Sequence, residues 1–142
     1  MALNSSEVPG AGLIAGHVGS IVANAVMLFV ARNALAWRLP FLTPAWADVL
    51  WAVELSLYAA IVASAVLLSY DAVWFRHLAA AIQGGFALQA GYWIWAVYPF
   101  DFGASDELFR LVTLLVMVAI AISVVVAVFA AVVELLREPF RA

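Results

Sequence analysis

Long apolar stretches dominate this chain and limit what it can fold into. Residues 111–133 carry no charged side chain, and three more mostly apolar stretches precede them. About 20 apolar residues in a helix cross a hydrocarbon layer ~30 Å thick. With 68% hydrophobic and 11% charged residues, a soluble domain of this length has no core large enough to hide so much apolar surface. The sequence therefore predicts an integral membrane protein.

Turn and capping residues divide the apolar stretches into four expected helices. Thr43 and Pro44 suit the start of the second helix, Asp71 can cap the third, and Ser105 can cap the fourth. The β-branched run at 123–129 is still read as helix, because an open sheet edge would leave backbone groups unpaired in lipid. We expect an all-α membrane protein, an antiparallel four-helix transmembrane bundle. Residues 1–142 form one membrane domain, with transmembrane helices at about 12–31, 44–69, 72–98 and 106–136.

Arginine positions indicate the orientation. Four spans place both termini and the loop between the second and third helices on one side. Arg76, Arg137 and Arg141 lie on that side, and Arg32, Arg38 and Arg110 lie on the other. We expect Arg110 to pair with an acid one turn earlier, which lowers its orienting weight. The basic C-terminal tail then predicts that both termini are cytoplasmic.

The loop "YPFDFGASDE", residues 98–107, is expected on the outer side, with its aromatic rings at headgroup level. Asp101 stands between Phe100 and Phe102. We expect it to cap the turn or to be solvated. The alternative is a binding role opposite Arg32 or Arg38.

Polar side chains inside the spans are costly in lipid and mark candidate functional positions. Glu54 is the main candidate, with Tyr58 one turn later on the same face and Asn24 or Gln89 as partners from other helices. An acid at this depth serves an ion or proton pathway, or it pairs locally or stays protonated. The candidate polar intramembrane site comprises Glu54, Tyr58, Asn24, Gln83, Gln89 and His17. A pore or ligand pocket lined by Asn24, Gln83 and Gln89 is an alternative to simple packing.

Small residues recur at helical spacing on the first and third helices. Such faces let two helix backbones approach closely. The spacing predicts a close contact between the first and third helices, or between two protomers. The residues expected in helix packing are Gly12, Gly16, Ser20, Gly84, Ala87 and Gly91.

No catalytic motif is visible. The chain has no cysteine, no glycine-rich phosphate loop, no Ser–His–acid set, no zinc-protease helix and no basic nucleic-acid patch. His17 and His77 are the only histidines, and two ligands do not close a metal or haem site. We therefore expect no enzyme activity, no catalytic residue, no metal, no cofactor and no nucleic-acid partner.

The chain resembles a group of small, uncharacterised four-span membrane proteins of actinobacteria and related bacteria. The resemblance lies in "PFLTPAWADVL", "LSYDAVWFRHL" and "WAVYPFDFGASDELFRLV", and it covers about residues 40–137. The group's usual turn before the fourth span is Phe-Pro-Phe-Asp-Phe, whereas Tyr98 stands first here. The resemblance implies four-span topology and a bacterial inner membrane. It carries over no functional residue.

Two functions are compatible with this pattern. The leading hypothesis is a non-catalytic membrane subunit or scaffold that acts through helix–helix contacts in a homo-oligomer or larger complex. The alternative is a small homo-oligomeric ion or proton channel or transporter using Glu54. The expected partners are the lipid bilayer and either further copies of the chain or another membrane protein. The expected location is the bacterial cytoplasmic membrane.

Overall fold

The computed structural model describes residues 11–140, and 84% of these residues are helical. Within these residues no strand forms, and a single pair of residues makes an isolated β-bridge. The all-α prediction is confirmed. The four long helices are α1 (Ala11–Asn33), α2 (Trp46–Ser69), α3 (Val73–Val97) and α4 (Asp106–Arg137), with short 3-10 turns at Gly103–Ser105 and Glu138–Phe140.

Three helical segments are long and apolar enough to cross a membrane. They are Gly12–Asn33, Trp46–Ser69 and Gly103–Phe140, which contain most of α1, all of α2 and all of α4. The membrane prediction is supported to this extent. We expected four such segments, and α3 is not among the three found between residues 11 and 140. Its 25 residues are long enough, but Arg76, His77 and two glutamines lower its apolar content.

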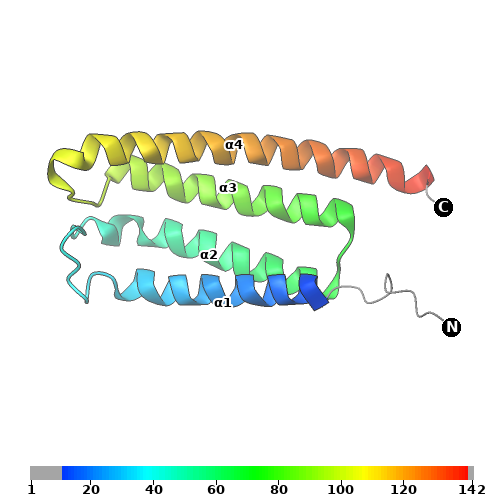
Figure 1. The fold of residues 1–142 in the computed structure, drawn as a ribbon, viewed down its shortest axis with the longest axis horizontal. Coiled ribbons are helices and arrows are strands. Elements are labelled where there is room, and N and C mark those ends of the chain that lie inside the picture. Colours follow the sequence, from blue (N-terminus) through cyan, green and yellow to red (C-terminus); the bar gives the residue numbers. More distant parts are fainter. Residues whose placement is uncertain (1–10, 141–142) are drawn as a thin grey trace.

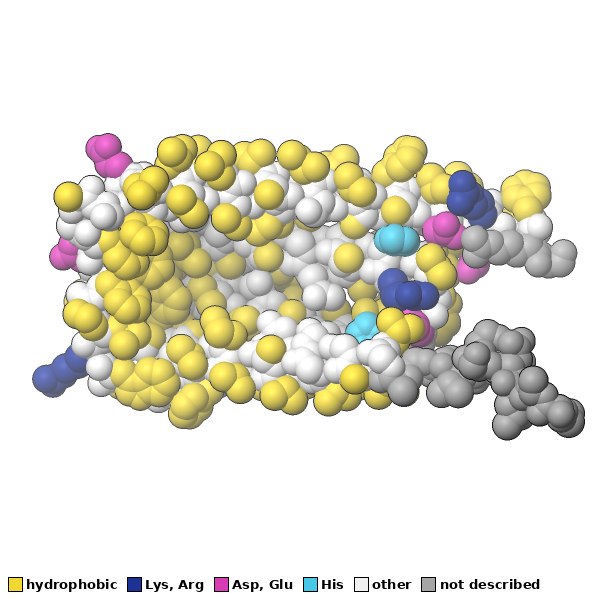
Figure 2. Space-filling model, viewed as in Figure 1, with side chains coloured by type: hydrophobic (Ala, Val, Ile, Leu, Met, Phe, Trp, Pro, Cys, Tyr) yellow, Lys and Arg dark blue, Asp and Glu magenta, His cyan; other side chains and the backbone are white. Residues whose placement is uncertain are grey.

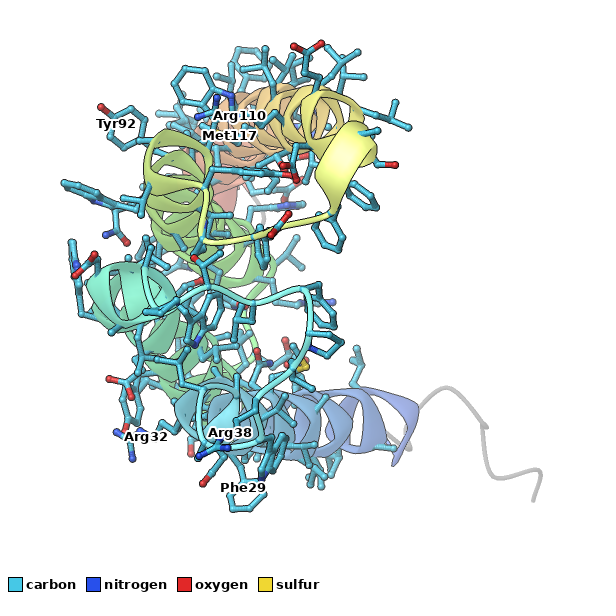
Figure 3. The ribbon with its side chains drawn as sticks, turned by 90° about the vertical axis from the view of Figure 1, so that its left-hand side faces the viewer. Phe29, Arg32, Arg38, Tyr92, Arg110 and Met117 are labelled. Atoms are coloured by element: carbon cyan, nitrogen blue, oxygen red, sulfur yellow. The ribbon has the colours of Figure 1, made fainter. Side chains whose placement is uncertain are left out.

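The helices lie side by side in chain order, and the chain reverses direction at each connection (Figure 1). Helix α1 packs on α2, α2 on α3 and α3 on α4, and no other pair of the four long helices in the described chain is in contact. Seen from one end, they form an arc with α1 and α4 at its two tips (Figure 3). The inner side of this arc is visibly hollowed (Figure 2).

The predicted contact between the first and third helices does not form within the chain. Helix α3 instead turns its glycines toward α4. A Cβ built at Gly84 would lie 2.5 Å from Val124 Cγ2, and one at Gly91 would lie 3.0 Å from Met117 Cγ. Close approach of α3 and α4 therefore requires glycine at position 84, whereas at position 91 the Met117 side chain would have to shift by a few tenths of an ångström. The small-residue spacing indicated such a contact, but with a different partner helix.

The loop between α1 and α2 joins the loop between α3 and α4. Leu42 and Phe100 form an antiparallel bridge, with Thr43 N donating to Pro99 O at 2.9 Å and Asp101 N donating to Phe41 O at 2.8 Å. Aromatic rings surround this bridge, since Phe102 stacks on Phe41, Phe100 and Phe109, while Trp46 and Tyr98 lie against Phe100. Two of the three stretches that carry the resemblance, residues 40–50 and 95–112, thus meet at one end of the molecule.

Helix ends differ from the predicted caps in detail. Neither Asp71 nor Ser105 bonds the helix start through its side chain, and α2 begins at Trp46 rather than at Pro44. Trp46 instead donates its indole N–H to the carbonyl of Ala31 at 2.9 Å, which satisfies one of the free carbonyls in the last turn of α1. The carbonyl end of α1 is thus capped by a side chain of α2.

Candidate functional site

Glu54 lies at the contact between α1 and α2, where Arg32 binds it. Arg32 Nε donates to Glu54 Oε1 at 2.5 Å, and Arg32 Nη2 donates to the hydroxyl of Tyr58 at 2.7 Å. The guanidinium also lies 5.7 Å from the centre of the Tyr58 ring. These three residues, called the α1–α2 ion-pair cluster below, lie on the outer side of the arc, where Figure 3 labels Arg32.

The α1–α2 ion-pair cluster balances one negative and one positive charge near one end of two candidate spans. The Glu54 side chain is 24% exposed and that of Arg32 is 50% exposed. A charge in hydrocarbon is tolerated when it is paired or can reach the interface. Arg32 stands one residue before the end of α1, so its long side chain can pair with Glu54 and also reach the membrane interface. Of the options left open for Glu54, local pairing is the one that the geometry displays.

Arg32 is the residue that sequence reasoning missed as the partner of Glu54. The sequence predicts that the first helix ends at about residue 31, which leaves Arg32 just outside it. In the structure α1 continues to Asn33, which places Arg32 inside the last helical turn and turned toward α2. Helix ends vary by one or two residues, and one residue rotates a side chain by 100° around the helix. The predicted partners Asn24 and Gln89 do not bond Glu54.

Asn24 and Gln83 line a common groove on the inner side of the arc. This inner groove has a volume of about 370 Å³ and contains residues of all four helices. Serines contribute further polar groups to its wall. The lining residues are Asn24, Ser56, Ala60, Gln83, Gly84, Ala87, Ile120 and Ser123.

A short hydrogen-bond chain fixes the α1 wall of the inner groove. Ser64 on α2 is buried and donates its hydroxyl to that of Ser20 at 3.0 Å. The amide of Asn24 donates to the Ser20 carbonyl at 2.8 Å. Ser20 was predicted as a packing residue, and it does pack, against α2. Gly12 and Gly16 were predicted with it, but a Cβ at either would meet nothing within 4 Å.

Gln89 and His17 lie apart from the α1–α2 ion-pair cluster. Gln89 lines a different groove, on the outer side between α2 and α3. Its amide nitrogen and oxygen are both buried without a hydrogen-bond partner, and so is Nε2 of His17. The six residues proposed as one polar site thus separate into four places, because helical spacing specifies a face but not which helix covers it.

The two loops joined by the Leu42–Phe100 bridge, called the loop bridge below, contain Asp101 and lie beside Asp106 and Arg110 at the start of α4. Asp101 Oδ1 accepts from the backbone N–H of Gly103 at 3.2 Å, so the prediction that Asp101 caps its turn is confirmed. Asp106 accepts from Phe102 N at 2.8 Å and from the Tyr98 hydroxyl at 3.2 Å. The predicted pairing of Arg110 with an acid is wrong. Its guanidinium lies 5.1 Å from the centre of the Tyr98 ring and donates to a backbone carbonyl of α3, because the carboxylate of Asp106 turns toward the loop.

No family model matches this chain, and neither a curated protein nor a solved structure matches it. The resemblance to small four-span proteins stays a prediction. Between residues 11 and 140 no group of three or more His, Cys, Asp or Glu side chains is placed to hold a metal ion. The residues singled out from the sequence form the ion pair of Arg32 with Glu54, line the open inner groove, and include the unpaired amide of Gln89.

Proposed function

We propose that the protein is a non-catalytic integral subunit or scaffold of a bacterial inner membrane, acting through helix–helix contacts with further copies or with another membrane protein. The observation that carries this proposal is the inner groove. Its polar residues, among them Asn24, Gln83 and Ser123, line a hollow that no helix between residues 11 and 140 covers. In lipid, polar side chains are stabilised when a neighbouring helix supplies hydrogen-bond partners for them.

The proposed membrane arrangement is an antiparallel four-helix bundle left open between α1 and α4. Here α3 is the fourth span, although its composition is less apolar. It packs between α2 and α4 along its length, and 25 helical residues extend about 37 Å at ~1.5 Å per residue, more than a ~30 Å hydrocarbon layer. Both termini are cytoplasmic, and the loop bridge lies outside.

The glycine face of α1 is a second support. Within the part of the chain that the structure describes, a Cβ built at Gly12 or Gly16 meets nothing within 4 Å beyond its own stretch of helix, while Gly84 and Gly91 of α3 are covered by α4. Two glycines four residues apart let a helix from another molecule approach to backbone distance. An uncovered pair next to an open groove favours a protein neighbour at the α1 tip of the arc.

Photo-crosslinking in native membranes tests the proposal. A benzophenone side chain in place of Ser123 faces the inner groove, and one in place of Val125, which is 69% exposed, serves as the matched control two residues away. We expect a protein adduct of defined mass at position 123 and mainly lipid adducts at position 125. Lipid adducts alone at both positions would contradict the proposal.

The alternative function is a polar path formed by several copies, and it has one observation in its favour. Asn24 and Gln83 share the inner groove, so facing grooves in an oligomer would enclose polar side chains. Glu54 does not line this groove and is bound by Arg32 instead. Flux of protons or small ions through liposomes that contain the purified protein tests this alternative. Leakage equal to that of empty liposomes would rule it out.

A further inference from the structure

A pocket with two opposite charges lies between the end of α3 and the start of α4. Its volume is about 330 Å³, and it is called the α3–α4 pocket below. Figure 3 shows Arg110 between these two helices, on the side away from the hollow of the arc. The α3–α4 pocket and the inner groove share no lining residue, so the two sites are independent of each other. The residues that line the pocket are Trp95, Glu107, Arg110, Leu111 and Leu114.

The two charges of the α3–α4 pocket are not paired with each other. Residues three apart in a helix are close enough to pair, yet Glu107 forms no ion pair between residues 11 and 140. The guanidinium of Arg110 turns to α3 instead, where it donates to the Trp95 carbonyl at 3.4 Å and lies 5.1 Å from the centre of the Tyr98 ring. A guanidinium has five N–H donors, so Arg110 keeps donors for a ligand. Both charged residues are exposed, so a ligand can reach them.

The position of the pocket along α4 determines what surrounds it. Arg110 is the last charged residue before the uncharged stretch 111–133, and α4 belongs to a segment long and apolar enough to cross a membrane. In such a helix the change from charged to uncharged residues marks the boundary between headgroups and hydrocarbon. Trp95 is 37% exposed, and tryptophan rings favour the same level. The α3–α4 pocket therefore faces phospholipid headgroups.

We propose that the α3–α4 pocket binds the headgroup of phosphatidylethanolamine. The guanidinium of Arg110 donates to the phosphate, because its planar fork matches the phosphate oxygens. The ammonium group, two carbon atoms further along the headgroup, donates to the carboxylate of Glu107 and lies near the ring of Trp95, whose face attracts a cation. An acyl chain runs along Leu111 and Leu114, which are 52% and 41% exposed and continue the same side of α4.

The charges of the pocket distinguish this headgroup from those of other phospholipids. Phosphatidylglycerol has the phosphate but no cation, so it would leave the carboxylate of Glu107 unpaired beside a negative charge. Phosphatidylcholine has a cation, but its trimethylammonium group has no N–H to donate to the carboxylate. The primary ammonium of phosphatidylethanolamine supplies both the positive charge and the hydrogen bonds. A zwitterion of this kind is complementary to an acid and a base that do not bind each other.

Native mass spectrometry of the full chain in a nonionic detergent tests the assignment. Phosphatidylethanolamine, phosphatidylcholine and phosphatidylglycerol with identical acyl chains are titrated one at a time. We expect the first molecule of phosphatidylethanolamine to bind each copy of the chain about 10-fold more tightly than phosphatidylglycerol and about 3-fold more tightly than phosphatidylcholine, because each competitor lacks a charge-assisted hydrogen bond. An affinity for phosphatidylethanolamine no higher than that for either of the other two lipids would overturn the proposal.

Glu107→Gln tests the acidic half of the site. The change keeps the size of the side chain and removes its charge, so the preference for phosphatidylethanolamine over phosphatidylglycerol should fall from about 10-fold to about 1-fold. The fold should be retained, since Glu107 is exposed and forms no ion pair within the described chain. Glu138→Gln, the same change at an exposed acid just past the other end of α4, should keep the preference. A preference that survives Glu107→Gln would contradict the assignment.

Arg110→Gln tests the basic half of the site. Without the guanidinium the phosphate loses its partner, so binding of phosphatidylethanolamine should weaken by about 10-fold. Arg137→Gln, the same change at the other end of α4, is the matched control and should leave the binding unchanged. Arg110 also contacts Tyr98, so the thermal unfolding of each variant is measured beside its lipid binding. Full-strength binding by Arg110→Gln would overturn the proposal, and Glu107→Gln decides the question if Arg110→Gln does not fold.

Discussion

Arg32 and Glu54 show how a single contact changes the meaning of a residue. A lone acid in a span is a candidate for a proton pathway, whereas an acid bound by a guanidinium is part of a helix contact. The distance of 2.5 Å between Arg32 Nε and Glu54 Oε1 shows that Glu54 is of the second kind, an acid within a helix contact. The function of Glu54 is therefore predicted to be structural.

Substitution of the ion pair tests this role. Glu54→Gln and Arg32→Gln should each lower the melting temperature of the protein in nanodiscs, because each leaves one charge without its partner. The double variant should lose less than the sum of the two single losses, since it leaves no unpaired charge. Strictly additive losses would mean that the two side chains act independently.

Tyr98 gives the loop bridge a dependence on alkaline pH. Partial burial raises the pKa of the Tyr98 hydroxyl above its ordinary value of 10.0, and the hydrogen bond to Asp106 raises the pKa further. The folded state thus favours the neutral phenol. The stability that this contributes is fully present below the ordinary pKa and is lost as the pH rises through the raised pKa.

We therefore expect the protein to lose stability between about pH 9 and about pH 11 by more than the variant Tyr98→Phe does. Thermal unfolding followed by circular dichroism at both pH values measures this difference. An equal loss in both proteins would place the alkaline transition elsewhere in the chain.

At the scale of helices, the contact between α3 and α4 depends on glycine at one position and not at the next. Gly84→Ala would place a Cβ 2.5 Å from Val124 Cγ2, whereas Gly85→Ala meets open space. Gly84→Ala should destabilise the protein by about 1–3 kcal/mol through overpacking. Gly85→Ala should be neutral or stabilising by up to ~1 kcal/mol. Unfolding in denaturant measures both, and equal stabilities would show that α4 does not approach Gly84.

The positions of the helices could be predicted from the sequence, but which helices pack against each other could not. The apolar stretches, the turn at Pro99 and the capping role of Asp101 are local features, and local features determine where a helix exists. The partner of Gly84 depends on which helix lies beside it, and two small-residue faces of similar spacing can pair in several ways. The pairing of Arg32 with Glu54 could not be predicted for a related reason. Helix α1 continues two residues beyond its expected end, and this turns Arg32 toward Glu54.

At the scale of the whole molecule, the proposed four-span arrangement places α3 across the membrane. This can be tested by single-cysteine labelling, because the chain has no native cysteine. Ala104→Cys in the loop bridge and Ser69→Cys at the end of α2 lie at opposite ends of α3 (Figure 1). In intact cells a membrane-impermeant maleimide should react with the cysteine at 104 and not with that at 69. Equal reactivity at both would mean that α3 does not cross.

The central claim is that the four helices of one chain form an open arc, and that another protein chain covers its inner groove. Native mass spectrometry of the protein, extracted from its own membrane with the surrounding lipid, tests this most directly. The account predicts a defined assembly, with several copies of the 15.2 kDa chain or one copy with a stoichiometric membrane partner. A single chain accompanied only by lipid would contradict it.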